Sequence, residues 1–332
     1  MKNHRITLQD IANLADVTKM TVSRYIKSPN LVAPETRKRI SEIMEEINYI
    51  PNRAPSMLLN TKSYTIGVLI PSFRNHLFSD LLAGIESVTT PKQYQTLIAN
   101  YNYSPEEEEE KIINLLSYNI DGIILCEKNH SIKAVKYLRS SNIPIVEVMD
   151  SEGPCLDMEV GYDNKKASFD MTKTMIENKK RKQVVYFGSQ DDRRDELRFQ
   201  GYTLGVREYG LKPYIISPKT ISSIEIGEYL CKEAFEKYPG MDGAICTNDD
   251  IAVGVLLYCK KNKISVPDEF SIAGFNGLEI GRRMIPSIAS VVTPRFQVGK
   301  TAAEILLNKI TNENFNSHSI ELGYQIYLGE TI

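Results

Sequence analysis

Short apolar runs alternate with helix-like segments along most of this chain, and that alternation restricts its fold more than any other feature. The runs contain few polar residues, which is typical of parallel strands covered by helices on both faces. In chain order they are residues 64–70, 96–99, 122–125, 143–148, 184–188, 214–216, 243–246 and 270–274. Helices are predicted over residues 75–88, 105–116, 132–138, 224–235 and 251–260, and one more is predicted to follow the run 184–188 and end at residue 209. Because the alternation occurs twice, it predicts an α/β core of two doubly wound parallel-sheet subdomains.

The length of the chain leaves room for a small N-terminal domain before this core. We expect that domain over residues 1–50, a hinge and linker over 51–62, and the core over 63–332. One subdomain should comprise residues 63–162 with tail elements from 293–332, and the other residues 163–292. Ligands of open α/β sheets bind beyond the carboxyl ends of the strands, so a ligand cleft is expected between the subdomains.

The first fifty residues have the pattern of three short helices. Thr7 with Asp10 three positions later fits a capping box, which predicts a helix from about Leu8. Thr18 can cap a second helix, and Pro34 suits the first position of a third. This arrangement is typical of a helix-turn-helix, in which the second helix enters the DNA major groove. The plain alternative is a small capping bundle with a solvated face. The side chains expected to project from the second helix are Lys19, Met20, Ser23 and Arg24.

The distribution of charge favours the DNA-binding interpretation. Residues 1–62 contain ten lysines and arginines against six acidic residues, a formal charge of +4. The rest of the chain contains 30 basic and 36 acidic residues, a charge of −6. A basic domain attached to an acidic core is what phosphate attraction requires when one end of a protein should contact DNA.

Three separated motifs then resemble the lactose repressor family of bacterial transcription regulators. They are Leu8-Gln9-Asp10-Ile11-Ala12, Val17-Thr18-Lys19-Met20-Thr21-Val22-Ser23-Arg24, and Asn48-Tyr49-Ile50-Pro51-Asn52 with Ala54 and Leu58. The resemblance implies a homodimer that binds a near-palindromic operator in double-stranded DNA. It places Lys19 and Met20 at the two main base-reading positions and Arg24 at a further groove contact. Thr18 and Ser23 complete the DNA-binding set that we predict on this helix.

The same resemblance implies a hinge helix that begins at Asn52. Leu58 matches the leucine that wedges into the minor groove and kinks the duplex. Pro55 departs from the family, which usually has alanine there, although proline is tolerated in a first helical turn. We expect a segment this short to be disordered off DNA and to fold on the operator.

Ligand contacts in the cleft follow from the resemblance position by position. They are Ser72, Asn75, Phe78, Asp150, Arg198, Asn248 and Asn276. Asn276 replaces the aspartate that many sugar-binding members have. A buried aspartate would repel a carboxylate, whereas a neutral asparagine beside arginines suits an acid ligand. Arg193 and Arg194 are further possible carboxylate clamps, which we add from the chemistry of arginine, and Arg194 is included in the predicted ligand-binding set.

Further motifs resemble the gluconate-utilisation repressor branch of the family and imply D-gluconate or a close aldonate as the inducer. They include Pro51-Asn52-Arg53-Ala54-Pro55, Gly84-Ile85-Glu86-Ser87-Val88-Thr89 and Cys246-Thr247-Asn248-Asp249-Asp250. The core of the family resembles periplasmic sugar-binding proteins, which agrees with the predicted fold. A neutral sugar, or a purine-type corepressor, remains an alternative effector within the same class of regulator.

Other classes of protein find less support. Gly299-Lys300-Thr301 resembles the end of a P-loop, but Pro294 occupies the position of its first glycine. The five cysteines and four histidines show no metal spacing, and no nucleophile–base set is evident. We therefore expect no enzyme activity, metal or cofactor. No apolar run reaches the ~20 residues of a membrane helix, and no signal peptide is evident, so we expect a cytoplasmic protein rather than an exported solute-binding protein.

Overall fold

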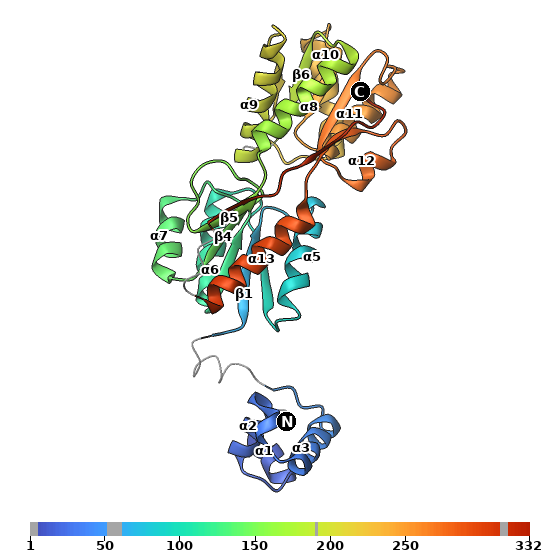
Figure 1. Ribbon diagram of the computed structural model, residues 1–332. Helices are drawn as coiled ribbons and strands as arrows, with labels where there is room; N and C mark the ends of the chain where they lie inside the picture. The colour runs from blue at the N-terminus through green and yellow to red at the C-terminus, as the bar shows by residue number, and fades with distance from the viewer. Residues whose placement is uncertain (1–5, 52–61, 190–191, 313–317) are drawn as a thin grey trace. The chain divides into compact units, whose positions relative to one another are not determined.

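The computed structural model describes residues 6–51, 62–189, 192–312 and 318–332. They divide into two compact units, Met1–Ser63 and Tyr64–Ile332 (Figure 1). The predicted hinge, with Asn52, Pro55 and Leu58, lies outside the described residues.

The first unit is a three-helix domain, as predicted. Its elements are α1 (Leu8–Leu14), α2 (Lys19–Lys27), a short 3₁₀ turn (Pro29–Leu31) and α3 (Pro34–Glu46). The capping box between Thr7 and Asp10 is present, and the Thr18 hydroxyl accepts a hydrogen bond from the backbone N–H of Thr21. Its core is formed by Ile11, Ala12, Ala15, Val22 and Ile40, with Ile43, Met44 and Ile47 packed against them.

The second unit contains two six-stranded sheets, and the predicted fold class is confirmed. The first sheet has the order β11-β5-β4-β3-β1-β2, and its strands are all parallel. Its strands are β1 (Thr65–Ile70), β2 (Gln95–Asn100), β3 (Gly122–Leu125), β4 (Ile145–Val148), β5 (Met158–Gly161) and β11 (Ser319–Glu321).

The second sheet has the order β12-β10-β9-β8-β6-β7. Its strands are β6 (Val184–Phe187), β7 (Ile215–Ile216), β8 (Gly243–Cys246), β9 (Ser271–Asn276), β10 (Ala289–Val292) and β12 (Gln325–Tyr327). β12 is antiparallel to β10, whereas the other pairs are parallel. The tail over 293–332 is therefore shared between the sheets, since β11 joins the first and β12 the second. The expectation that this tail belongs with the first subdomain needs that correction.

Helices cover both faces of each sheet. α5 (Leu77–Thr89) and α13 (Arg295–Thr311) pack on one face of the first sheet, and α6 (Pro105–Ser117) and α7 (Ile132–Ser141) on the other. On the second sheet, α8 (Asn164–Lys179) and α9 (Arg193–Glu208) lie opposite α10 (Ile224–Lys237) and α11 (Asp249–Lys261). The short helix α12 (Glu279–Arg283) follows β9. Among the described residues, no helix is long and apolar enough to cross a membrane.

Two glycines allow α5 and α13 to approach closely, side by side in Figure 1. A Cβ atom at Gly84 would lie 2.1 Å from the carbonyl oxygen of Phe296, and one at Gly299 would lie 2.0 Å from that of Leu81. Gly299 is thus an interhelical packing residue in the middle of α13, which explains why the Gly299-Lys300-Thr301 sequence has no phosphate-binding loop around it.

Candidate DNA interface and ligand cleft

The predicted DNA-reading residues lie on one short helix of the N-terminal domain. Val22 is fully buried and anchors α2, whereas Lys19, Met20 and Arg24 are exposed and Ser23 is half-buried. Met20 is 70% exposed, so its side chain is accessible to a partner. Thr18 caps the helix, so the N-terminal turn that carries Lys19 and Met20 is fixed in the unit itself.

In the core, Arg198 is the most firmly held of the predicted ligand residues. It lies on α9 and is 6% exposed. Its Nε donates to Asn164 Oδ1 at 3.0 Å and its Nη1 to the Thr247 carbonyl at 2.7 Å. The guanidinium carbon lies 3.8 Å from the centroid of the Phe275 ring, a cation–π stacking distance. Three elements of the second subdomain therefore hold one positive charge in place.

Arg194 lies one turn before Arg198 and contacts the first subdomain. Its guanidinium carbon is 6.0 Å from the centroid of the Phe78 ring on α5, and Nη2 donates to Asp192 at 3.1 Å. Burial alone would lower the pKa of Arg194, but the carboxylates of Asp192 and Glu127 hold that pKa above its ordinary value. The buried Nη1 has no hydrogen-bond partner among the residues that the structure describes. A buried charged donor of this kind calls for an acceptor.

Asp150 and Arg193 bind each other rather than standing free. The Asp150 carboxylate accepts from Arg193 Nε at 2.8 Å and from the backbone N–H of Glu152 at 3.0 Å. Arg193 also donates to the Glu152 carbonyl at 2.8 Å. Asp150 follows β4 of the first sheet and Arg193 begins α9 of the second subdomain. This ion pair therefore joins the two subdomains.

Asn248 and Asn276 follow neighbouring strands of the second sheet. The Asn248 side chain caps α11 by accepting from the Ile251 N–H at 3.1 Å. Asn276 is fully buried at the end of β9 and has a φ of +98°, a conformation that side chains other than glycine rarely adopt. Its Oδ1 has no hydrogen-bond partner within the described ranges. The Asn276 side chain is thus an available acceptor beside the residue, Phe275, that stacks on Arg198.

Ser72, Asn75 and Phe78 come from the segment between β1 and α5. Asn75 Nδ2 donates to the hydroxyl of Tyr103 at 3.3 Å, and Ser72 Oγ accepts from the Arg74 N–H at 3.0 Å. Ser72 and Asn75 line a cavity of about 810 Å³. The other six predicted ligand residues line none of the cavities described here.

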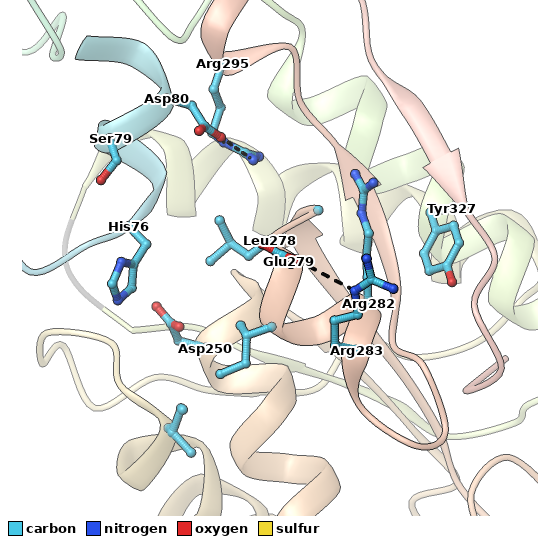
Figure 2. A pocket seen from close by; sticks show the side chains of 13 residues that line it. His76, Ser79, Asp80, Asp250, Leu278, Glu279, Arg282, Arg283, Arg295 and Tyr327 are labelled. Carbon is cyan, nitrogen blue, oxygen red and sulfur yellow. Dashed lines mark hydrogen bonds and ion pairs between the residues drawn. The ribbon is translucent and has the colours of Figure 1, made fainter. Parts of the chain in front are cut away.

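A second cavity of about 870 Å³ adjoins the first, since His76, Ile224 and Asp250 line both. It too is lined from both subdomains (Figure 2), with Ser79 and Asp80 on α5 and Arg282 and Arg283 on α12. Figure 2 shows Arg295 reaching Asp80, with an Nη2–Oδ2 distance of 2.8 Å. Cavities of this size, lined by polar groups from two subdomains, can accommodate a small polar metabolite.

Several residues of the cleft were not predicted from the sequence. Asn164 and Phe275 hold Arg198, Tyr101 and Glu127 lie close to Arg194, and the buried Tyr162 hydroxyl has no partner among the described residues. Tyr101, Glu127 and Tyr162 all stand just past the carboxyl end of a strand. Because the strands before Tyr101 and Glu127 were predicted, their positions could have identified these two residues as ligand contacts. Tyr162 could not be found in this way, because β5, the strand before it, was not predicted.

Comparison with known proteins agrees with both units. Residues 7–52 match the model of bacterial regulatory proteins of the lacI family, and residues 172–332 match a periplasmic binding protein-like domain. The chain is 61% identical over 332 residues to the HTH-type transcriptional regulator IdnR of Escherichia coli K12 and 43% identical to GntR of the same strain. Each alignment covers 100% of both chains. A solved lacI-family regulator from Silicibacter pomeroyi superimposes with a TM-score of 0.89 at 29% identity, covering 98% of this chain and 99% of that one.

These relatives are named as transcriptional regulators and not as enzymes. The two full-length matches also agree with the resemblance to the gluconate-utilisation branch. The three-helix unit with its exposed α2 and the two-sheet core are the two parts that the matched families comprise. The chain is therefore a DNA-binding transcription regulator that belongs to the lacI family of bacterial regulatory proteins.

Proposed function

We propose that this regulator is a repressor which binds a near-palindromic operator as a homodimer in the cytoplasm and releases it when a sugar acid binds between its subdomains. D-gluconate, or a closely related aldonate, is the proposed inducer, and genes for gluconate uptake and catabolism are the proposed targets. The observation that carries the effector class is that a buried donor, Arg194 Nη1, and a buried acceptor, Asn276 Oδ1, both lack a hydrogen-bond partner among the described residues. An aldonate has a carboxylate for the first and hydroxyl groups for the second.

Two buried arginines and a neutral side chain in the cleft support an acid ligand. Arg194 and Arg198 are buried on consecutive turns of α9, and the side chain at position 276 is neutral. Two like charges about 4 Å apart repel by about 4 kcal/mol at an effective dielectric constant of 20, so an aspartate at 276 would strongly oppose a bound carboxylate. Arginine binds carboxylates with two parallel hydrogen bonds, which makes Arg198 and Arg194 the proposed clamps. Ser72, Asn75, Phe78, Asp150 and Asn248 are proposed to contact the rest of the ligand.

At the DNA end, Lys19 and Met20 are the proposed base-reading residues. Thr18, Ser23 and Arg24 are proposed to contact the groove or the phosphates. Asn52 and Leu58 are proposed to act in the hinge, with Leu58 as a minor-groove wedge. Ligand binding is proposed to change the relation of the two subdomains, shift the dimer interface and spread the hinges. A coupling free energy of about 1–3 kcal/mol is enough for such a switch.

The test combines DNA binding with calorimetry. Operator sequences are selected from a random duplex library, and fluorescence anisotropy then measures affinity with and without D-gluconate. We expect tight binding that weakens at least tenfold when D-gluconate is added. Calorimetry with D-gluconate, ribose and hypoxanthine identifies the effector class. Binding of ribose or hypoxanthine without gluconate would assign the neutral-sugar or purine-type alternative, and no preference for any duplex would reject the repressor itself.

A further inference from the structure

A buried carboxylate lies directly behind the turn that carries Asn276. Asp249 is the first residue of α11 and is fully buried. Its Oδ2 accepts from the backbone N–H of Leu278 at 2.5 Å, and its Oδ1 accepts from the hydroxyl of Ser290 at 2.6 Å. Asp249 lines neither of the two cavities described above.

The hydroxyl of Ser290 extends this network by one residue. Ser290 Oγ accepts from the backbone N–H of Gly277 at 3.0 Å while donating to Asp249. Two consecutive N–H groups, those of residues 277 and 278, are therefore anchored to Asp249, one directly and one through Ser290. On the other side of the turn, Arg295 donates to the carbonyl oxygen of Asn276.

This anchoring matters because the turn is strained. Asn276 has a φ of +98° and Gly277 a φ of +65°. A residue other than glycine persists in such a conformation only where its surroundings hold it, at a cost on the order of 1–3 kcal/mol. The packing leaves Asp249 no freedom, since a Cβ atom at Gly274 would lie 2.2 Å from Asp249 Oδ1. The glycine at 274 therefore makes room for the carboxylate under β9.

Keeping the carboxylate there is itself costly. Burial raises the pKa of Asp249 to about 7, against the opposing effects of Ser290, Leu278 and Arg295. If Asp249 served only to fill space, an apolar residue of similar size could replace it with little loss of stability. Asp249 instead supplies one acceptor oxygen to the Leu278 N–H of the turn and the other to the Ser290 hydroxyl on β10.

We propose that Asp249, with Ser290, is a positioning residue that fixes the 276–278 turn and thereby orients the Asn276 side chain for ligand recognition. The recognition half of this proposal rests on the proposed function, whereas the anchoring of the turn does not. Asp249 acts through Asn276 and does not touch the ligand. Its replacement should therefore affect ligand affinity only when Asn276 is present to be oriented.

The first experiment needs no ligand. Amide hydrogen exchange at Gly277 and Leu278 is compared in the wild type, Asp249→Asn and Ser290→Ala. We expect exchange at least fivefold faster in both variants. Ser287→Ala is the matched control, because this buried serine precedes the same strand but its Oγ contacts the Tyr327 hydroxyl. It should leave both amides unchanged. Unaltered exchange in Asp249→Asn and Ser290→Ala would overturn the proposal, whatever the effector is.

The second experiment is a double-mutant cycle. Calorimetry measures the affinity for D-gluconate and its C5 epimer L-idonate in the wild type, Asp249→Asn, Asn276→Ala and the double variant. We expect Asp249→Asn to weaken binding about tenfold in the wild-type background and less than twofold in the Asn276→Ala background. Equal losses in both backgrounds would show a merely structural role and overturn the recognition half.

Ser290→Ala, run through the same cycle, covers the case in which Asp249→Asn does not fold. If the wild type binds neither aldonate, the proposed effector is wrong. The cycle is then run with ribose or hypoxanthine, whichever binds, and the exchange result still decides whether Asp249 anchors the turn.

Discussion

A buried histidine in the first subdomain should make the core less stable as the pH rises. His130, in the loop between β3 and α7, is enclosed by two buried glutamates. Its Nδ1 lies 3.0 Å from Glu108 of α6 and its Nε2 lies 3.2 Å from Glu147 of β4. The three side chains are at most 2% exposed. Both ring nitrogens can donate only when the imidazole is protonated, so the charged form is the one that satisfies both carboxylates.

The sign and size of the effect follow from the pKa of this histidine. Burial alone would lower it, but the hydrogen bonds that His130 donates to Glu108 and Glu147 outweigh burial and raise the pKa from 6.5 to about 9. The native state therefore binds a proton that the unfolded chain releases above pH 6.5. The stabilisation is fully present below pH 6.5 and is lost as the pH rises through 9. A rise of this size corresponds to about 3 kcal/mol.

The measurement is urea unfolding between pH 6 and 10, followed by far-UV circular dichroism and tyrosine fluorescence because the chain has no tryptophan. The free energy of unfolding of His130→Gln should lie about 3 kcal/mol below the wild type at pH 6, and this gap should close toward pH 10. His318→Gln, at an exposed histidine, is the control and should keep the wild-type pH dependence. A gap that stays constant with pH would refute the assignment of a protonated His130.

Three further predictions concern DNA reading, ligand binding and packing. Lys19→Ala should reduce discrimination between operator variants by about 1–3 kcal/mol in anisotropy titrations, whereas Lys27→Ala, at the other end of α2, should weaken all duplexes alike; uniform loss for Lys19→Ala would contradict base reading. Arg198→Met should bind D-gluconate at least tenfold more weakly by calorimetry and still bind operator. A normal response to D-gluconate would show that Arg198 does not bind the ligand. Gly84→Ala should lower the free energy of unfolding in urea by about 3 kcal/mol, because its Cβ would lie 2.1 Å from Phe296 O. The control Ala83→Gly, at an exposed position of the same helix, should cost about 1 kcal/mol. Equal costs would argue against close packing of α5 and α13.

Charged residues inside an element explain why the sequence did not reveal β5. β5 contains Glu159, which interrupts the apolar run expected of a buried strand. In the folded core that carboxylate is buried against Lys128 and the hydroxyl of Ser319, partners that are 31 and 160 positions away. Its polarity is thus compensated by tertiary contacts that a local pattern cannot contain. Among the strands that were predicted, β3 and β8 have no charged residue, and β4 has one, Glu147, near the end of an apolar run.

α8 was overlooked for a related reason. Its lysines give it a polar appearance, although Ala167, Met171 and Met175 recur every four residues and form its buried face. That spacing was present in the sequence and would have supported a helix. By contrast, β12 joins the second sheet because the chain crosses back from the first subdomain to the second. A strand of only three residues, Gln325–Tyr327, has no local sequence pattern that predicts this antiparallel pairing.

For the ligand residues too, the sequence indicated which residues lie in the cleft but not which partners they bind. Sequence analysis placed Asp150, Arg193 and Arg194 in the ligand cleft, and the fold brings them together. It did not indicate that Asp150 and Arg193 pair with each other at 2.8 Å across 43 positions, while Arg194 keeps a buried nitrogen unpartnered among the described residues. Which guanidinium is available to a ligand is decided by these pairings, so adjacent arginines that look equivalent in the sequence differ in the folded protein.

Two physical reasons favour asparagine over aspartate at position 276. Its neutrality suits an anionic ligand, and it also avoids a second negative charge near Asp249, whose pKa burial has already raised to about 7. An aspartate at 276 would oppose the ionised form of Asp249, which anchors Leu278 and Ser290. Asn276→Asp should therefore weaken anion binding and loosen its own turn together. The double variant Asn276→Asp with Asp249→Asn separates the two effects. It removes the repulsion between the two side chains but keeps the repulsion between the new carboxylate at position 276 and an anionic ligand, so ligand binding should stay weak while the turn is no longer loosened.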